Sequence, residues 1–234
     1  MTLTLTVSDE VRALAPGFTH VAVEAHELTN GPTTEASSAL LDDAARRLAA
    51  RLDGRAPHED PHMAAWREVY TAFGSKPSRT RNSAEALAKR ALSDAGLPRV
   101  NVLVDVYNAI SVAHLIPVGG EDLDLIQGGM RLVRATGDED FVTVAGGEET
   151  VEHPDAGEVV WCDEAGVTCR RWNWRQGPRT RLTEGAVSGL FLLERLAPMP
   201  VAEAEAAAAE LAELLEKFSP GARITVHAPH SAAA

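Results

Sequence analysis

The order in which two hydrophobic patterns occur along the chain constrains its fold more than any other feature. Between Thr34 and Leu115 apolar residues recur mainly with helical spacing, whereas from Met130 to Arg171 short β-branched runs alternate with glycine-rich or acidic turns. Helices that come first and strands that cluster later are typical of α+β folds rather than of repeated βαβ units. The sequence therefore predicts an α+β fold.

Individual elements follow from the same patterns and from their end signals. Asn82 is a residue type that caps helices, and Gly96 and Pro98 are stop signals. The predicted helices are Thr34–Leu52, Pro61–Phe73, Asn82 to near Gly96, Val100–Leu115 and Val201–Phe218. The predicted strands are a short one at the start, Phe18–Ala25, several within 130–171, Leu190–Leu196 and Arg223–His227, with a loop at Pro117–Gly120.

Length and composition limit the class of protein. A chain of 234 residues with 45% hydrophobic content can bury a core, and no long linker divides it. We expect one domain over residues 1–228 and a disordered tail at 229–234. No apolar run approaches the ~18 residues of a membrane span, and the start lacks the pattern of a signal peptide. We expect a soluble, cytoplasmic protein without membrane contact, whose Cys162 and Cys169 are reduced thiols.

The charge distribution bears on possible partners. A net charge of −12 argues against general binding of nucleic acid, DNA included, because phosphates repel an acidic surface. Basic residues nevertheless gather in two places: Arg79, Arg81, Lys89 and Arg90, and Arg170, Arg171, Arg175, Arg179 and Arg181. Each group is either a solvated face or a local phosphate contact that could hold the end of one RNA.

Familiar catalytic signatures are missing. The sequence contains no GxSxG, Walker A, HExxH or GxGxxG motif. His58 and His62 are four residues apart, but Pro61 between them argues against one helix through both. We predict neither a metal site nor a cofactor.

Three segments have compositions that allow a role beyond structure. Asn108 and Ser111 interrupt a strongly apolar stretch, where they either satisfy neighbouring backbone or line a pocket. The Gly119–Gly120 pair after Pro117 permits a turn or a close approach of the backbone to a ligand. The segment 170–175 reads RRWNWR, and Trp and Arg can stack on a base or an aromatic amino acid. If 170–175 is a strand, both tryptophans lie on one face.

The motifs together support a family resemblance. The run VDVYN–AISVAHL–IPVGGEDLDLIQGGMRLVRA and the later GEVVWCD resemble the B3/B4 module of phenylalanyl-tRNA synthetase β chains. The segment WR-x-x-Y-x-x-FG-x-x-P-S from Trp66 to Ser78 and the RWNWRQ box are similar to free-standing B3/B4 domain proteins. The resemblance covers roughly Val7 to Leu196, and the C-terminal helix and strand lie outside it.

The resemblance implies a layered β/β/α sandwich, with an N-terminal helical segment and a C-terminal helix–strand extension added here. In the synthetase this module hydrolyses tyrosine wrongly attached to phenylalanine tRNA. The family's pocket asparagine matches Asn108, and its substrate-reading glutamate matches Glu194. A loop histidine of the synthetase is Gly119 here, a pair of small pocket residues falls near Trp172–Asn173, and a frequent threonine is Ala186.

The leading hypothesis is an aminoacyl-tRNA deacylase that acts in trans on the aminoacylated 3′ end. The backbone N–H groups of Gly119 and Gly120 would contact the oxyanion, Asn108 would orient the ester or water, and Glu194 would read the substrate or act as base. The predicted substrate-binding residues are Ser111, Trp172, Asn173, Trp174, Arg175 and Arg179, the two arginines for phosphate. The alternatives are a non-catalytic module that binds a tRNA end, an amino acid or a metabolite, and a hydrolase of another amino-acid ester or amide.

Overall fold

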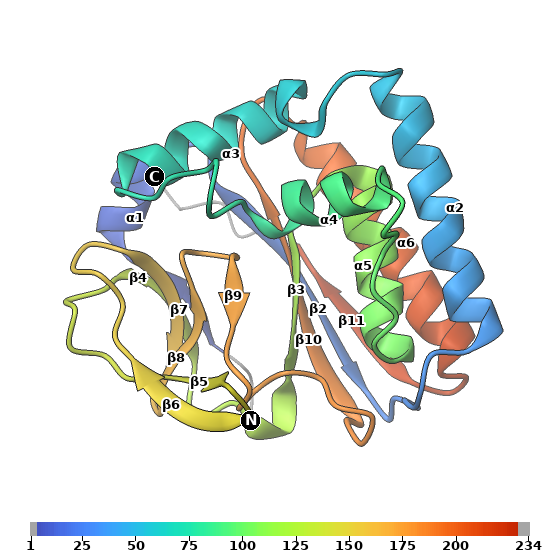
Figure 1. Cartoon of the computed structure of the whole chain (residues 1–234). Helices are drawn as coiled ribbons and strands as arrows, with labels where there is room; N and C mark the ends of the chain where they lie inside the picture. Colours follow the sequence, from blue (N-terminus) through green and yellow to red (C-terminus); the bar gives the residue numbers. More distant parts are fainter. Residues whose placement is uncertain (1–3, 229–234) are drawn as a thin grey trace.

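The computed structural model of the chain describes residues 4–228, which form two sheets and a layer of helices (Figure 1). The helices are α1 Asp9–Leu14, α2 Glu35–Leu52, α3 Pro61–Ala72, α4 Ser83–Ala91, α5 Val102–His114 and α6 Val201–Phe218. The tail predicted at 229–234 lies outside the described residues. Within 4–228 no helix has the length and apolar character that crossing a membrane requires.

The strands are arranged in two larger sheets and one separate hairpin. One sheet has the order β11-β2-β10-β3 and is antiparallel throughout; its strands are β2 Thr19–His26, β3 Val118–Asp122, β10 Ser188–Arg195 and β11 Arg223–His227. The other has the order β1-β4-β7-β8-β9, with only β1 and β4 parallel; its strands are β1 Leu5–Val7, β4 Met130–Arg134, β7 Val159–Asp163, β8 Gly166–Arg170 and β9 Arg175–Gln176. The hairpin joins β5 Phe141–Ala145 and β6 Glu148–Glu152.

The three layers lie in the order sheet, sheet, helices (Figure 1). Helices α5 and α6 pack on the β3–β10–β2–β11 sheet, and α2 packs on α5. The five-stranded sheet lies toward the other face, and side chains from both sheets share one apolar core. The predicted α+β class and its β/β/α layering are therefore confirmed.

Most predicted helices begin at the capping residue that the sequence offers. The side chain of Thr34 accepts from the N–H of Ser37 at 3.1 Å, and Asn82 accepts from the N–H of Glu85 at 2.9 Å. Helix α5, which the apolar periodicity of 100–115 left ambiguous, is capped by Asn101, whose side chain accepts from Val104 N–H at 3.0 Å. Helix α6 and strand β11 have the predicted bounds. Both cysteines are free, as predicted.

Two local predictions were wrong. Helix α4 ends at Ala91 rather than near Gly96. The loop predicted at Pro117–Gly120 is largely strand β3, because Val118, Gly119 and Gly120 pair with β10. Residues 171–174 form a turn between β8 and β9, so the condition under which both tryptophans would share one strand face is not met. At the start of the chain a short helix, α1, follows the predicted strand, and the N–H of Val11 donates to the Ser8 hydroxyl at 3.4 Å.

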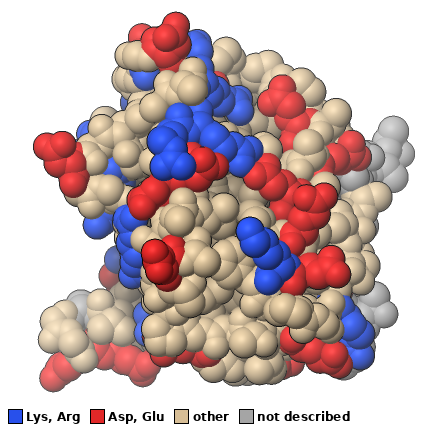
Figure 2. Space-filling model, turned by 90° about the vertical axis from the view of Figure 1, so that its right-hand side faces the viewer, with Lys and Arg blue, Asp and Glu red and all other residues tan. Residues whose placement is uncertain are grey.

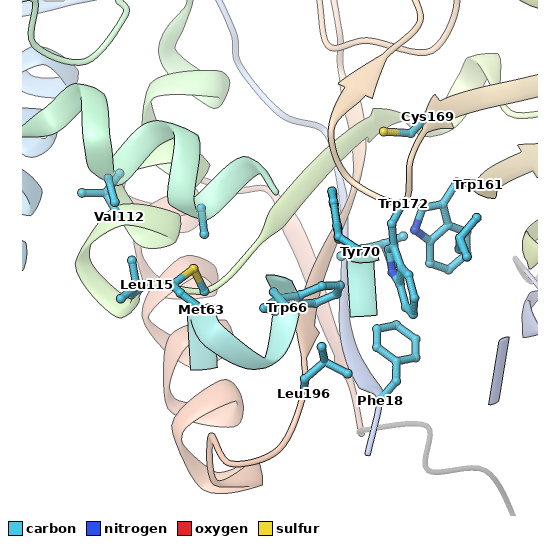
Figure 3. Close-up of a cluster of buried hydrophobic side chains, with 14 of the residues drawn as sticks. Phe18, Met63, Trp66, Tyr70, Val112, Leu115, Trp161, Cys169, Trp172 and Leu196 are labelled. Carbon is cyan, nitrogen blue, oxygen red and sulfur yellow. The ribbon is translucent and has the colours of Figure 1, made fainter. Parts of the chain in front are cut away.

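The WR-x-x-Y motif forms the aromatic centre of the core (Figure 3). Trp66 and Tyr70 on α3 are buried, and the Trp66 ring meets the Trp172 ring edge-on at 5.2 Å between centroids. Phe18 packs against Trp172 at 4.9 Å between centroids, also edge-on. Such edge-to-face contacts between aromatic rings add ~0.5–1.5 kcal/mol to the burial of their surface. The motif therefore packs against Trp172 of the β8–β9 turn and supports that turn from the core side.

His62 links α3 to two other elements. Its Nδ1 lies 3.1 Å from the carbonyl of Leu115, and its Nε2 accepts from Trp66 Nε1 at 3.0 Å and from the N–H of Leu196 at 3.2 Å. Burial lowers the pKa of His62 to about 4, so the ring is neutral at pH 7. The role of this histidine in the described structure is to join elements of the core.

Candidate functional site

A cavity of about 160 Å³ lies between the two sheets at the edge of β3. Its walls come from strands β3, β10, β7 and β8, from the turn after β8, from the start of α4, from α5 and from β9. The residues that line it are Ser83, Tyr107, Val118, Gly119, Gly120, Glu121, Trp161, Cys169, Trp172, Asn173, Trp174, Gln176, Leu192 and Glu194. An engineered cavity of about 150 Å³ in another protein holds a benzene ring, so this one has room for one ring-sized group.

Glu194 lies on the wall of the cavity with its carboxylate held by neutral donors. Its Oε1 accepts from Trp161 Nε1 and from Trp172 Nε1, each at 2.9 Å. Its Oε2 accepts from Asn173 Nδ2 at 2.8 Å. A carboxylate offers about four acceptor positions, so these three bonds fix its orientation and leave one position for a ligand or water.

The environment of Glu194 changes its acidity. Burial raises the pKa of Glu194 to about 7, and the hydrogen bonds from Asn173, Trp161 and Trp172 only partly oppose this effect. The side chain is 2% exposed. A carboxyl group with a pKa near the working pH is suited to accept and return a proton.

Asn173 is positioned by a second layer of contacts. Its Oδ1 accepts from the Tyr70 hydroxyl at 2.7 Å and from the N–H of Ser83 at 3.4 Å. The amide can therefore donate only through Nδ2, which faces Glu194. Tyr70 of the WR-x-x-Y motif thus orients the cavity carboxylate through one intermediate side chain.

The turn that carries both tryptophans has a strained backbone. Arg171 and Trp172 have φ values of 45° and 66°, in the left-handed region that non-glycine residues seldom occupy. Such residues cost about 1–3 kcal/mol each and persist where the surroundings hold them. Here the N–H of Trp172 donates to Val159 O at 2.6 Å, and the indole lies in the core. The turn is therefore held in a shape that sends Trp172 inward to Glu194.

Trp174 has different surroundings from Trp172. It is half-buried and lines the cavity, with the guanidinium of Arg171 4.9 Å and that of Arg175 5.0 Å from its ring centroid. Because the segment is a turn, the two tryptophans do not share the single face that a strand would have produced. Trp172 supports Glu194, whereas Trp174 forms part of the cavity wall.

The two glycines of β3 have opposite surroundings. A side chain at Gly119 would meet nothing within 4 Å, whereas a Cβ at Gly120 would lie 2.8 Å from Tyr107 Cε1. The N–H of Glu194 donates to Pro117 O at 2.9 Å, so the alternation of an antiparallel ladder turns the N–H of Gly119 toward β10 and that of Gly120 toward the free edge. Of the two predicted oxyanion donors, Gly120 is the one whose N–H points out of the ladder.

The structure does not bring two of the predicted site residues to the cavity. Asn108 is buried on α5 but is not among the lining residues; its neighbour Tyr107 is. The Ser111 hydroxyl donates to Ile116 O at 2.7 Å and so stabilises the end of α5. Ser111 therefore fits the alternative in which a polar residue of this helix satisfies neighbouring backbone.

The two arginines predicted to hold phosphate are already paired with acids. Arg179 donates to both carboxylate oxygens of Asp163, at 2.6 and 2.9 Å. Arg175 forms an ion pair with Glu152, which also accepts from Arg170 at 2.8 Å. Neither arginine lines the cavity. A phosphate at these positions would have to displace a carboxylate.

Glu121 is the main cavity residue that the sequence reasoning missed. It is 5% exposed, and its Oε2 accepts from Gln176 Nε2 at 2.6 Å. Burial raises the pKa of Glu121 to about 8, in spite of the hydrogen bond from Gln176 that lowers it. Strand alternation would have placed Glu121 on the same face as Gly119, but the segment was interpreted as a loop.

Two further features limit the chemistry of the site. Burial raises the pKa of the Cys169 thiol well above its usual range, so it is not a thiolate nucleophile at neutral pH. Across residues 4–228 no group of three or more His, Cys, Asp or Glu side chains is arranged to hold a metal ion. The reactive capacity of the cavity therefore lies in its two glutamates.

The side of the molecule on which α2 lies has no continuous basic surface. Blue and red groups adjoin one another there, with wide neutral areas between them (Figure 2). Ion pairs such as Arg47–Glu210 at 2.5 Å and Arg99–Asp42 at 2.5 Å belong to α2 and its neighbours. This side is not suited to follow the backbone of an RNA.

Comparison with known proteins gives one family match. The family model described as the B3/4 domain matches residues 65–220, more than half of the chain. The structure is similar to that of an N-terminal fragment of the phenylalanyl-tRNA synthetase β-subunit from Pyrococcus horikoshii, with a TM-score of 0.46 and 12% identity. That match covers 96% of this chain and 50% of the fragment, so the chain spans about half the fragment's length. No curated protein sequence matches the chain.

Proposed function

Because the chain belongs to the B3/4 domain family, we propose that it binds the aminoacylated 3′ end of a tRNA and hydrolyses the ester of a wrongly attached amino acid. The observation that carries this proposal is Glu194, a carboxylate with a pKa raised to about 7 on the wall of a ring-sized cavity. The size of the cavity suits one amino-acid side chain. The resemblance of the motifs to the synthetase module points to an aminoacyl ester of tRNA as the substrate.

The proposed reaction needs one proton acceptor and one oxyanion donor. A water molecule attacks the ester carbonyl carbon while Glu194 accepts one of its protons. The N–H at Gly120 stabilises the oxyanion of the tetrahedral intermediate. When the C–O bond to the ribose breaks, Glu194 returns the proton to the leaving ribose oxygen, which yields a free amino acid and a tRNA hydroxyl. Trp161, Trp172 and Asn173 keep the carboxylate aimed throughout.

We expect Glu194→Gln to lower the kcat of deacylation at least tenfold with little change in KM, because glutamine cannot accept the proton. The measurement is hydrolysis of a panel of mischarged tRNAs, with Glu213→Gln on the exposed face of α6 as the matched control. In the native protein the rate should rise with pH and level off above about 7, following the pKa of Glu194.

The pH profile keeps the test decisive even where Glu194→Gln folds poorly. No acceleration over buffer for any tRNA in the panel would refute the deacylase, as would a rate independent of pH between 5 and 8. A Glu194→Gln variant that raises KM and leaves kcat unchanged would instead assign Glu194 to reading the substrate side chain.

A basic segment beside the cavity is a candidate phosphate contact. Lys76 and Arg79 are exposed in the loop that leads to Ser83 on the cavity wall. Arg81 in the same loop lies 3.4 Å from Glu85 in an ion pair and is therefore less available. This loop replaces Arg175 and Arg179 as the proposed holder of the RNA end.

We expect the double variant Lys76→Ala/Arg79→Ala to bind tRNA with a shallower salt dependence. Each single-strand phosphate contact contributes about 0.7 to the slope of log affinity against log salt, so the slope should fall by about 1.4. Binding is measured by titration of tRNA at several salt concentrations. Lys217→Ala at the end of α6 serves as a control for loss of positive charge. An unchanged slope would exclude this loop as the RNA contact.

One observation favours a second candidate, a binding module without catalysis. The lining residues, all within 4–228, include no histidine or other basic side chain, and the thiol of Cys169 is neutral. In that case a small ligand would raise the melting temperature without being turned over. The same tRNA panel separates the two functions.

A further inference from the structure

The cavity combines acidic and aromatic side chains in an unusual proportion. Two of its lining residues are glutamates and four are aromatic, namely Tyr107, Trp161, Trp172 and Trp174. None of the lining residues, which all belong to the described range, is Lys, Arg or His. Once its glutamates are ionised, a wall of this composition repels carboxylates and phosphates. Aromatic ring faces beside acids are features of sites for organic cations.

The two glutamates stand at opposite ends of the cavity floor. Glu121 pairs with Leu190 and Gly119 with Leu192, so Glu121, Gly119 and Glu194 project to one face of the sheet. Glu121 lies opposite Leu190, which is four residues before Glu194 on β10. This separation corresponds to about 13 Å along the strands. Gly119 lies between them without a side chain, and space for a ligand remains above it.

Among residues 4–228, no Lys, Arg or His forms an ion pair with Glu121. Its Oε2 accepts from the amide of Gln176. The charged groups that act on the pKa of Glu121 are Arg179 and Asp163, which form their own two-bond pair at 2.6 and 2.9 Å. The remaining polar neighbours are Thr180 and the Tyr107 hydroxyl. The carboxyl is thus buried beside a cavity without a counter-charge, which is costly for its ionised form.

We propose that the Glu121 end of this cavity is a subsite for an organic ammonium group. A bound ammonium supplies the missing counter-charge to Glu121, and the ring of Tyr107, which lies beside Gly120 and Glu121, provides further cation–π attraction. A neutral group of the same shape gains neither interaction, and an anion meets two acids. The volume of about 160 Å³ limits the ligand to one compact group.

Applied to an aminoacyl ester, this inference rests on the proposed function. The cation is then the free ammonium of the amino acid, and the subsite distinguishes it from an acylated nitrogen. Hydrolysis of an N-acetylated aminoacyl-tRNA should accordingly be at least tenfold slower than hydrolysis of the same tRNA with a free amine. Binding of a small free ammonium does not depend on the deacylase.

Proton release distinguishes this subsite from a merely apolar cavity. Burial raises the pKa of Glu121 to about 8, so the carboxyl is mostly protonated at pH 7. A cation that requires the ionised form must displace this proton, and its affinity therefore rises as pH increases toward 8 and then levels off. Below the pKa the rise is about tenfold per pH unit.

The experiment titrates the full chain with tetramethylammonium, whose charge does not change with pH, by calorimetry at pH 6, 7 and 8. We expect binding that strengthens with pH and releases a proton, detected by comparing buffers of different ionisation enthalpy. tert-Butanol, a neutral probe of similar shape, should bind more weakly and independently of pH, and acetate should not bind. Glu121→Gln should weaken tetramethylammonium at least tenfold and abolish the pH dependence, whereas Glu149→Gln on exposed β6 should not.

Equal affinity for tetramethylammonium and tert-butanol, or no proton release in the native protein, would overturn the subsite. The second readout uses no variant, so a poorly folding Glu121→Gln does not weaken the test. Cation binding without deacylation would retain the subsite and reject the deacylase. Deacylation at the same rate with and without N-acetylation, together with no cation binding, would retain the deacylase and reject the subsite.

Discussion

Trp172→Ala is expected to lower the free energy of unfolding by about 3–5 kcal/mol, the range for removing a large aromatic side chain from a core. Trp172 is fully buried, packs edge-on against Trp66 and Phe18 (Figure 3), and donates its indole N–H to Glu194 at 2.9 Å. The substitution removes these contacts together and leaves one acceptor position of Glu194 unfilled. Urea unfolding followed by circular dichroism measures the change.

Trp174→Ala is the matched control, two residues away in the same turn. Trp174 is only half-buried, and its two cation–π contacts lie near the surface. We expect a loss of about 1 kcal/mol or less, typical of such contacts at exposed sites. Equal destabilisation by the two variants would contradict the assignment of Trp172 to the core and Trp174 to the cavity wall.

The second large effect is the pH dependence of stability contributed by Glu194. Its pKa rises from an ordinary value of 4.5 to about 7 in the folded protein, mainly because of burial. The folded state therefore binds this proton more tightly than the unfolded state between these values. The resulting stabilisation is complete below about pH 4.5 and is lost as pH rises to 7 and above, by on the order of 3 kcal/mol.

The difference between native protein and Glu194→Gln isolates this contribution. Glutamine does not titrate, so the native protein should lose stability relative to the variant as pH rises from about 5 to 7.5. The pKa shift of Glu121 has the same sign as that of Glu194. Because Glu121 is present in both proteins, its contribution to stability cancels in the difference. Unfolding by urea at several pH values gives the comparison, with Glu213→Gln as the control. A difference that is constant with pH would mean that Glu194 stays ionised throughout.

Local signals in the sequence were sufficient for most of the helices. Asn82 and Thr34 are N-caps in the structure because their side chains accept from N–H groups three residues later, which is a short-range property. The same holds for α6, where Ala204, Ala207, Leu211 and Leu215 recur at helical spacing and are buried. The family resemblance supplied the layered α+β class, which the structure confirms.

The β3 segment shows where local signals failed. Two glycines after a proline favour a turn when only neighbours in sequence are considered. The structure places them in a strand because β10, about 70 residues later, offers a full ladder of hydrogen bonds. Only in a strand do Gly119 and Glu121 project to the same face. Because the segment was predicted as a loop, Glu121 was not recognised as a cavity residue.

The candidate site was therefore only partly predictable. Glu194, Gly119, Gly120, Trp172, Asn173 and Trp174 were selected from the sequence and line one cavity, although their chemical roles stay predictions. Asn108 and Ser111 were selected because polar residues stood out in an apolar helix, but helix geometry turns them away from the lining. Arg175 and Arg179 were selected by charge, and their partners Glu152 and Asp163 come from other strands.

By itself the sequence determined the starts of α2 and α4, the bounds of α6, the α+β class and the family, because capping, periodicity and ordered motifs are properties of neighbouring residues. Only the tertiary structure decided which charges are neutralised, which glycine N–H leaves the ladder, and that Glu121 and Glu194 share one cavity. Those features depend on groups far apart in sequence that meet in a low-dielectric interior, where pairing and burial set the pKa of each carboxyl.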